Sequence, residues 1–215
     1  MTVDNDKDNE EQEDDEGLVE TPPTRKKCMT NNNLAPFTPT MPQVQKVAIQ
    51  MMQLTSSDVL FDLGCGDGRL LVAAAQAVPG IHCVGVELDP MYADRANMIL
   101  RSLPNDICQR IHIREGDVLN DRILRGGGMT TAAGGKDFNF MEDATAVFLF
   151  LMPRGLETIR PLMEQVAWTR KEQGKPFRVI SYIFTIKSWT AVQMDKSTKG
   201  DVGIYLYDQS SIDFG

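Results

Sequence analysis

The sequence has no long apolar run, few histidines and no closely spaced cysteines. A membrane-spanning helix needs about 20 consecutive apolar residues, and no stretch of this chain reaches that length. The four cysteines form no C-x-x-C pair, and two histidines complete no zinc pattern. We therefore expect no metal, no membrane span, and reduced thiols in a cytoplasmic or nuclear protein.

Basic residues are scarce at the start of the chain, where acidic residues gather. Residues 1–20 hold ten acidic side chains and one lysine, so their net charge of -9 is larger in magnitude than the formal net charge of -8 of the whole sequence. The other residues carry 20 acids and 21 bases, so we expect no basic surface for nucleic acid. An N-terminus this acidic is typical of neither a secretory signal nor an Arg-rich mitochondrial presequence.

Residues 1–33 are charged and polar, which predicts a disordered acidic tail because such a segment cannot bury a core. One domain is expected over residues 34–215, with a flexible Gly-rich insertion at residues 125–140. Within the domain, apolar strands alternate with amphipathic helices, which predicts a doubly wound, mostly parallel Rossmann-like α/β sheet. Strands are expected at residues 59–63, 82–86, 111–114, 146–151, 177–185, 191–196 and 203–207. Helices are expected from Pro42, where Thr40 serves as the cap, and at residues 69–78, 89–103 and 155–170.

A glycine-rich turn follows the first expected strand, in the sequence Asp62-Leu63-Gly64-Cys65-Gly66-Asp67-Gly68. Glycine permits positive φ and lets the backbone come close to a ligand. The helix that begins after Gly68 directs its free amides and partial positive charge toward the same place. In open α/β sheets ligands bind at the carboxyl ends of the strands, where this turn lies. A lone G-x-G turn is often only structural, so the acidic residues around it decide the interpretation.

Three acidic positions favour S-adenosylmethionine (SAM) as the ligand. Asp62 would be costly to bury as a core residue, whereas as a ligand group it can meet the cationic amino group of SAM. Glu87 follows Gly66 by 21 residues, the offset at which an acid accepts hydrogen bonds from ribose hydroxyls. Asp117, after the third strand, can accept a bond from the adenine amino group while Val118 packs on the ring. The structural alternatives are a surface acid at a strand end and a plain turn.

A nicotinamide dinucleotide is the rival cofactor. The dinucleotide-binding turn has the pattern G-x-G-x-x-G, whereas the glycines here follow G-x-G-x-G. Asp62 and the Gly116-Asp117 pair also favour SAM. The residues expected to contact this cofactor are Asp62, Gly64, Gly66, Asp67, Gly68, Glu87, Leu88, Asp117 and Val118.

Together these motifs resemble the class I SAM-dependent methyltransferases. More narrowly, they resemble the small protein-lysine methyltransferase family that includes the lysine methyltransferase of the ATP synthase c subunit. The resemblance covers roughly residues 35–208, and its more specific parts are Pro36-Phe37-Thr38-Pro39-Thr40 and Leu151-Met152-Pro153. It implies a seven-stranded fold, SAM as methyl donor and a protein lysine as acceptor. The acidic N-terminus differs from the hydrophobic targeting segment of the mitochondrial members, which argues against their mitochondrial substrate.

The acceptor is expected at the carboxyl end of the fourth strand. There Leu151, Met152 and Pro153 should face the segment of Phe37, Thr38, Pro39 and Thr40. The absence of an Asn-Pro-Pro-Tyr motif argues against DNA adenine and glutamine acceptors. No general base is assigned, because a dry pocket can by itself keep a lysine amine neutral.

Several apolar side chains near these motifs are interpreted as core. Phe148 and Phe150 belong to an expected strand, and Met51, Met52, Met91 and Met98 have helical spacing. Because a fold does not fix the acceptor, two alternatives stay open. One is a small-molecule or RNA methyltransferase, and the other is a non-catalytic SAM-binding module.

Overall fold

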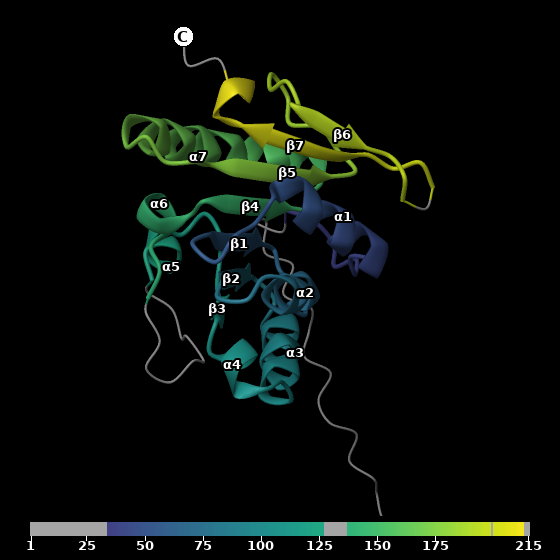
Figure 1. The fold of residues 1–215 in the computed structure, drawn as a ribbon, viewed down its shortest axis with the longest axis vertical. Coiled ribbons are helices and arrows are strands. Elements are labelled where there is room, and N and C mark those ends of the chain that lie inside the picture. Colours follow the sequence, from purple (N-terminus) through teal and green to yellow (C-terminus); the bar gives the residue numbers. More distant parts are fainter. Residues whose placement is uncertain (1–33, 127–136, 199, 213–215) are drawn as a thin grey trace, which may run out of the picture.

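The computed structural model describes residues 34–126, 137–198 and 200–212. It holds a seven-stranded sheet in the order β3-β2-β1-β4-β5-β7-β6 (Figure 1). The strands are β1 (Val59–Leu63), β2 (His82–Glu87), β3 (Ile111–Glu115), β4 (Ala146–Leu149), β5 (Arg178–Tyr182), β6 (Gln193–Asp195) and β7 (Ile204–Asp208). Strands β1 to β5 pair in parallel, and β7 is antiparallel to both β5 and β6. The predicted mostly parallel, doubly wound sheet is confirmed.

Helices cover both faces of the sheet. They are α1 (Pro42–Met52), α2 (Arg69–Ala77), α3 (Pro90–Arg101), α4 (Asn105–Cys108), α5 (Asp121–Leu124), α6 (Phe140–Asp143) and α7 (Pro153–Glu172), followed by the 3-10 helix η1 (Gln209–Ser211). The short helices α4, α5 and α6 and the helix η1 were not expected from the sequence. The long helices were expected, with ends that differ by a few residues.

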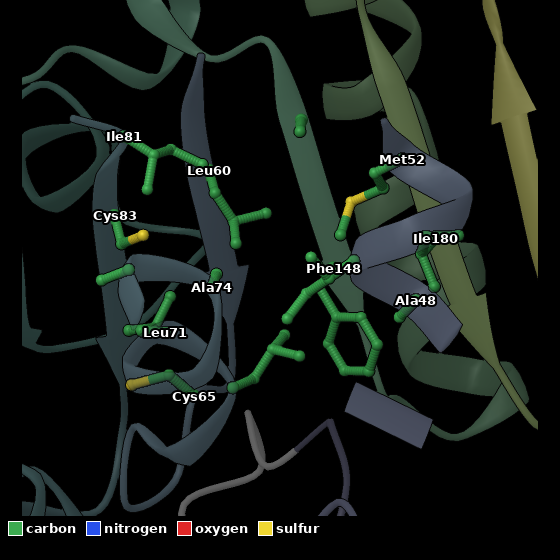
Figure 2. Packing of buried hydrophobic residues seen from close by; sticks show 14 of the residues in the cluster. Ala48, Met52, Leu60, Cys65, Leu71, Ala74, Ile81, Cys83, Phe148 and Ile180 are labelled. Atoms are coloured by element: carbon green, nitrogen blue, oxygen red, sulfur yellow. The ribbon is translucent and has the colours of Figure 1, made fainter. Parts of the chain in front are cut away.

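Alternate strand residues belong to two separate cores, as the two-residue period of a strand requires. Leu60, Phe148 and Ile180 pack with α1 and α2 on one face (Figure 2), and α3 adds to the same core. Phe61 and Val147 face the other way, toward α6 and α7. Met51 and Met52 are buried in the first core, as expected. Both faces of the parallel strands are thus dry, which explains their nearly continuous apolar sequence.

Two expectations about helices have opposite outcomes. Asp89 caps α3 as expected, because its side chain accepts a hydrogen bond from the Met91 amide at 2.9 Å. The expectation for Thr40 is wrong, since α1 has Met41 at its N-cap and no side-chain cap. The carbonyl of Thr40 instead accepts a hydrogen bond from Gln45 Nε2 at 2.8 Å. Gln45 thereby fastens the chain before α1 to its first turn.

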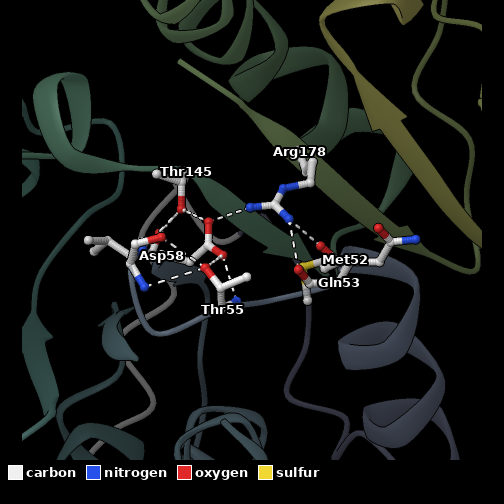
Figure 3. A network of polar contacts seen from close by, with 8 residues as sticks. Met52, Gln53, Thr55, Asp58, Thr145 and Arg178 are labelled. Carbon is white, nitrogen blue, oxygen red and sulfur yellow. Dashed lines mark hydrogen bonds and ion pairs between the residues drawn. The ribbon is translucent and has the colours of Figure 1, made fainter. Parts of the chain in front are cut away.

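A polar network closes the amino edge of the sheet (Figure 3). Asp58, just before β1, accepts hydrogen bonds from Thr145 Oγ1 at 2.7 Å and from the amide and hydroxyl of Thr55. It also pairs with Arg178, which donates to the carbonyl of Met52 at the end of α1. Burial opposes ionisation of Asp58, but these donors together hold its pKa below the usual value. The network joins α1, β1, β4 and β5 where the strands begin.

The expected flexible insertion at residues 125–140 is corrected at its far end. Phe138 and Phe140 are buried in the second core, so residues 137–140 are part of the fold. The buried Arg114 on β3 holds both ends of the insertion in place. It donates hydrogen bonds to the carbonyl of Leu124 before the insertion and to Asp137 and Phe138 after it. Residues 127–136, like the expected tail at residues 1–33, lie outside the described residues.

Candidate functional site

Strand β1 carries a buried carboxylate near its carboxyl end. Asp62 is aligned with Gly85 on β2 and Phe148 on β4. Among the described residues, no hydrogen-bond donor or cation contacts it. Burial, together with the nearby Glu87 and Asp67, raises the pKa of Asp62 to about 8. A cationic group entering this place would lower that pKa again and would pair with the ionised carboxylate.

The glycine turn (residues 64–68) lies directly beyond this carboxylate. The amides of Gly64 and Cys65 both donate to the carbonyl of Val86, at 2.8 and 3.1 Å, which fastens the turn to β2. Gly64 has a φ of 92° and is exposed. Gly66 has a φ of 56°, and a Cβ atom there would lie 2.5 Å from the Phe37 ring. A side chain at either position would thus meet backbone strain, and at Gly66 also a ring.

Glu87 braces the turn from β2. Its Oε2 accepts a hydrogen bond from the Gly66 amide at 2.8 Å, and its Oε1 accepts one from the Asp89 amide at 2.9 Å. Burial raises the pKa of Glu87, and these two hydrogen bonds oppose the rise. A carboxylate offers about four acceptor positions, so Glu87 keeps acceptor capacity for a ligand.

Asp67 and Gly68 lie at the turn but face the helices. The Asp67 carboxylate accepts a hydrogen bond from Arg69 Nε at 2.8 Å and lies 3.9 Å from Arg95 Nε. The hydrogen bond from Arg69 holds the pKa of Asp67 below its usual value. A Cβ atom on Gly68 would lie 3.3 Å from the Cβ of Ala96 on α3. The Asp67 side chain therefore fixes the start of α2, and Gly68 lets α3 pack closely.

The loop after β3 lies at the same edge of the sheet as Glu87. Glu87 is aligned with Glu115 on β3, and the Gly116 amide donates to the Glu87 carbonyl at 2.8 Å. Asp117 Oδ1 accepts a hydrogen bond from the Leu119 amide at 2.8 Å, which shapes the turn. Val118 is buried in the second core, and Leu88 is half-buried. These expected cofactor contacts thus follow two adjacent strands.

The segment before α1 crosses the carboxyl edge of the sheet. The Leu34 carbonyl accepts a hydrogen bond from the Met152 amide at 3.3 Å, beside Gly155 at the start of α7. The Phe37 ring stacks on Tyr92 in the first turn of α3, with centroids 3.9 Å apart. The segment therefore reaches from α7 to α3, and Phe37 lies on the side of the glycine turn.

The other expected acceptor-channel residues differ in exposure. Thr38, Pro39, Met152 and Pro153 are exposed, whereas Thr40 and Leu151 are buried. The Leu151 side chain lies 3.6 Å from where a Gly64 Cβ would be. The structure thus brings Leu151, two residues past β4, next to the glycine turn, whereas the acceptor role of these residues stays a prediction.

Two aromatic contacts at this edge were missed. Tyr92, which stacks on Phe37, belongs to no recognised motif. Phe150, which was interpreted as core, lies past the end of β4, is half-buried and packs against the first core. Its edge-on contact with Tyr182, a member of that core, was not foreseen. The strand register could have placed Phe150 and Tyr182 side by side, whereas nothing in the sequence pairs Phe37 with Tyr92.

The described part of the chain holds neither a cluster of metal ligands nor a membrane-spanning helix. No group of three or more histidine, cysteine, aspartate or glutamate residues is arranged to hold a metal ion there. No helix in the same residues is long and apolar enough to cross a membrane.

A curated relative shares sequence over most of the chain. It is a protein-lysine N-methyltransferase of Saccharolobus islandicus (strain REY15A), 28% identical over 178 residues. The match covers 80% of this chain and 92% of the relative. No family model matches the chain.

Solved structures share the fold. An RNA methyltransferase from Salinibacter ruber, in complex with S-adenosyl-L-homocysteine, has a TM-score of 0.63 and 24% identity. That match covers 83% of this chain and 98% of the Salinibacter chain. A putative O-methyltransferase from Klebsiella pneumoniae has a TM-score of 0.52 and 15% identity, and the match covers 80% and 82% of the two chains. At these identities the likeness concerns the fold.

Proposed function

We propose that this chain, a class I SAM-dependent methyltransferase, transfers the methyl group to the side-chain amine of a protein lysine. The observation that carries the donor site is the uncompensated Asp62 carboxylate beside the glycine turn. The lysine acceptor is supported by the Saccharolobus relative.

The charges and the hydrogen-bond acceptors of the described residues support SAM as the ligand. Asp62 would meet the cationic amino group, and the exposed backbone of Gly64 leaves room for the methionine part. Glu87 would accept hydrogen bonds from the ribose hydroxyls with its remaining acceptor positions. Asp117 would accept one from the adenine amino group, between the apolar side chains of Leu88 and Val118. Bound SAM supplies a methyl carbon that is activated by the adjacent sulfonium.

The residues of this chain contribute mainly by positioning the acceptor amine and by surrounding it with apolar side chains. Holding an acceptor in line with a reactive carbon can lower a barrier by about 7–11 kcal/mol. The buried Leu151 and the half-buried Phe37 place apolar surface beside Gly64. Because a dry pocket disfavours the ammonium form, it lowers the pKa of a lysine acceptor and leaves its lone pair available.

Substitution of Gly66 tests the donor site. Gly66→Ala should lower SAM affinity at least about tenfold in calorimetry, because the added Cβ displaces Phe37 and strains the turn. Gly174→Ala is the matched control, since Gly174 has a φ of 63° with no atom within 4 Å of an added Cβ. Equal SAM affinity in the two variants would overturn the assigned donor site.

A labelling experiment tests the acceptor. The protein is incubated with radiolabelled SAM and a lysate of the source organism, and the labelled species is identified by mass spectrometry. The proposal requires label on protein lysine. Label on RNA or on a metabolite would overturn the lysine assignment, and no label despite SAM binding would indicate a non-catalytic module.

A further inference from the structure

An aromatic pair, Phe150 and Tyr182, lies at the carboxyl edge of the sheet beside the glycine turn. The two ring centroids are 4.7 Å apart, and the ring planes meet at 62°. One step back from the edge, Phe148 is aligned with Asp62 on β1 and with Ile180 on β5. Because one face recurs every two residues, Phe150 lies between the glycine turn and Tyr182, on the face covered by α1 and α2.

The glycine turn, Phe150 and Tyr182 follow three neighbouring strands, and the distance across them is short enough for one ligand. Neighbouring strands lie about 4.8 Å apart, so the backbones of Gly64 and Tyr182 are separated by roughly 10 Å across β4. The donor site ends at Gly64, where the Leu151 side chain also lies. A group that approaches the donor from the β5 side would therefore pass Phe150 and Tyr182.

The Tyr182 hydroxyl is available to such a group. Within the described residues it makes no hydrogen bond, and its oxygen is not among the enclosed polar atoms that lack a partner. The oxygen is therefore not fully enclosed, although the residue as a whole is only 7% exposed. By contrast, the hydroxyl of Tyr207 on the opposite face accepts a hydrogen bond from the Ile186 amide at 3.0 Å. Burial raises the pKa of Tyr182, so the phenol stays neutral.

The backbone after Tyr182 is held in an unusual conformation. Ile183 has a φ of 73°, which β-branched residues normally avoid. Its amide donates to the Gly203 carbonyl at 2.9 Å, and the Ser181 hydroxyl donates to the Phe184 carbonyl at 2.6 Å. Such strain gathers at functional sites, where the surrounding contacts maintain it. Here it ends β5 directly after Tyr182 and fixes that residue beside Phe150.

We propose that Phe150 and Tyr182 form one wall of the acceptor pocket, and that the Tyr182 hydroxyl binds the acceptor amine and limits the number of methyl groups it receives. This inference rests on the proposed lysine methyltransferase function. An amine N–H donated to the Tyr182 oxygen orients the nitrogen lone pair toward the donor methyl group. The flat Phe150 ring packs against the lysine methylenes.

The restriction on further transfer follows from the chemistry of the amine. The nitrogen lone pair forms the new N–C bond, the electrons of the breaking C–S bond pass to sulfur, and the resulting ammonium loses a proton to water. The product amine has one N–H fewer. Its new methyl group competes for the space beside the Tyr182 oxygen, so the next transfer is slower.

Removal of one oxygen atom tests the proposal. The probe is a synthetic peptide library with one central lysine, prepared in unmodified, monomethyl and dimethyl forms. In Tyr182→Phe, the rate on the monomethyl library relative to the unmodified one should rise about fivefold, as loss of one hydrogen bond predicts. Mass spectrometry should show more di- and trimethyl product, while the calorimetric affinity for S-adenosylhomocysteine and the melting temperature stay unchanged.

Tyr205→Phe is the matched control. It removes the same atom from β7, where the Tyr205 ring packs with the second core on the other face of the sheet, and it should leave the product ratio unchanged. An unchanged ratio in Tyr182→Phe would overturn the inference and leave the methyltransferase function intact, and loss of S-adenosylhomocysteine binding would assign Tyr182 to the donor site instead. If the wild-type protein binds S-adenosylhomocysteine but labels no lysine library, the proposed lysine function fails, and the inference fails with it.

Discussion

Two aspartates at opposite ends of β1 show how the two edges of the sheet differ. Asp58 and Asp62 are equally buried, each with 4% of its surface exposed. Asp58 has hydrogen bonds from Thr145 and Thr55 and an ion pair with Arg178 (Figure 3). Asp62 has no such partner among the described residues. At the amino edge the buried carboxyl group has its partners within the fold, whereas at the carboxyl edge the buried carboxyl group lacks a partner that a ligand could supply.

The two carboxyl groups affect stability in opposite pH ranges. The folded protein lowers the pKa of Asp58, so its stabilisation is present above the usual value of 3.8 and is lost as the pH falls below it. The pKa of Asp62 is raised to about 8, so its stabilisation is complete below 3.8 and is lost as the pH rises toward 8. Above pH 8 the ligand-free protein therefore carries an unfavourable buried charge.

The largest effect is expected at the amino edge. Asp58→Ala should lower the free energy of unfolding by about 3–5 kcal/mol, because it removes the buried carboxylate that binds the half-buried Arg178 and the hydroxyls of Thr145 and Thr55. Urea unfolding measures the change, with Asp94→Ala on the exposed face of α3 as the control. Adding Arg178→Met to Asp58→Ala should recover part of the loss. A loss no larger than that of Asp94→Ala would show that the network does not hold the edge together.

Local patterns account for what the sequence predicted correctly. The apolar runs located the strands, and Asp89 followed by Pro90 marked the start of α3, because these signals lie within a few residues of one another. The glycine turn was recognised for the same reason. The contacts that were missed join distant segments. Arg178 and Asp58 are 120 residues apart, and Phe37 reaches Gly66 across α1 and β1.

The exposed methionines of α3 show the limit of periodicity. Met91 and Met98 were expected in the core, but they are 58% and 67% exposed. The buried stripe of α3 consists of Ala93, Ala96 and Leu100. Both methionines lie on the opposite side of the helix, since a spacing of seven residues repeats one face without identifying it. The buried face of α3 is the one whose Ala96 lies close to Gly68, a contact that the periodicity of the helix does not identify.

A smaller effect is expected at the carboxyl edge. Asp62→Asn should lower SAM affinity about 10–100-fold, the contribution of a hydrogen bond to a charged group. The same variant should raise the melting temperature of the ligand-free protein at pH 9, because it removes an unpaired buried charge. Calorimetry with methylthioadenosine, which lacks the methionine amino group, should give equal affinity for the variant and the wild-type protein. Equal loss with both ligands would place Asp62 elsewhere than at the amino group.

The smallest expected effect is the release of a proton when SAM binds, and it involves the same carboxyl group. With a pKa of about 8, Asp62 is mostly protonated in the ligand-free protein at pH 7. A cationic amino group favours the ionised form, so SAM binding at pH 7 should release up to about one proton, and at pH 9 almost none. Calorimetry in two buffers with different ionisation enthalpies measures that number, and Asp62→Asn should abolish the difference between the buffers. If the wild-type protein releases no proton at pH 7, the Asp62 charge does not change on binding. Asp62 and Asp58 would then both be structural carboxylates, and the contrast between the two edges would have to rest on Glu87 and the glycine turn alone.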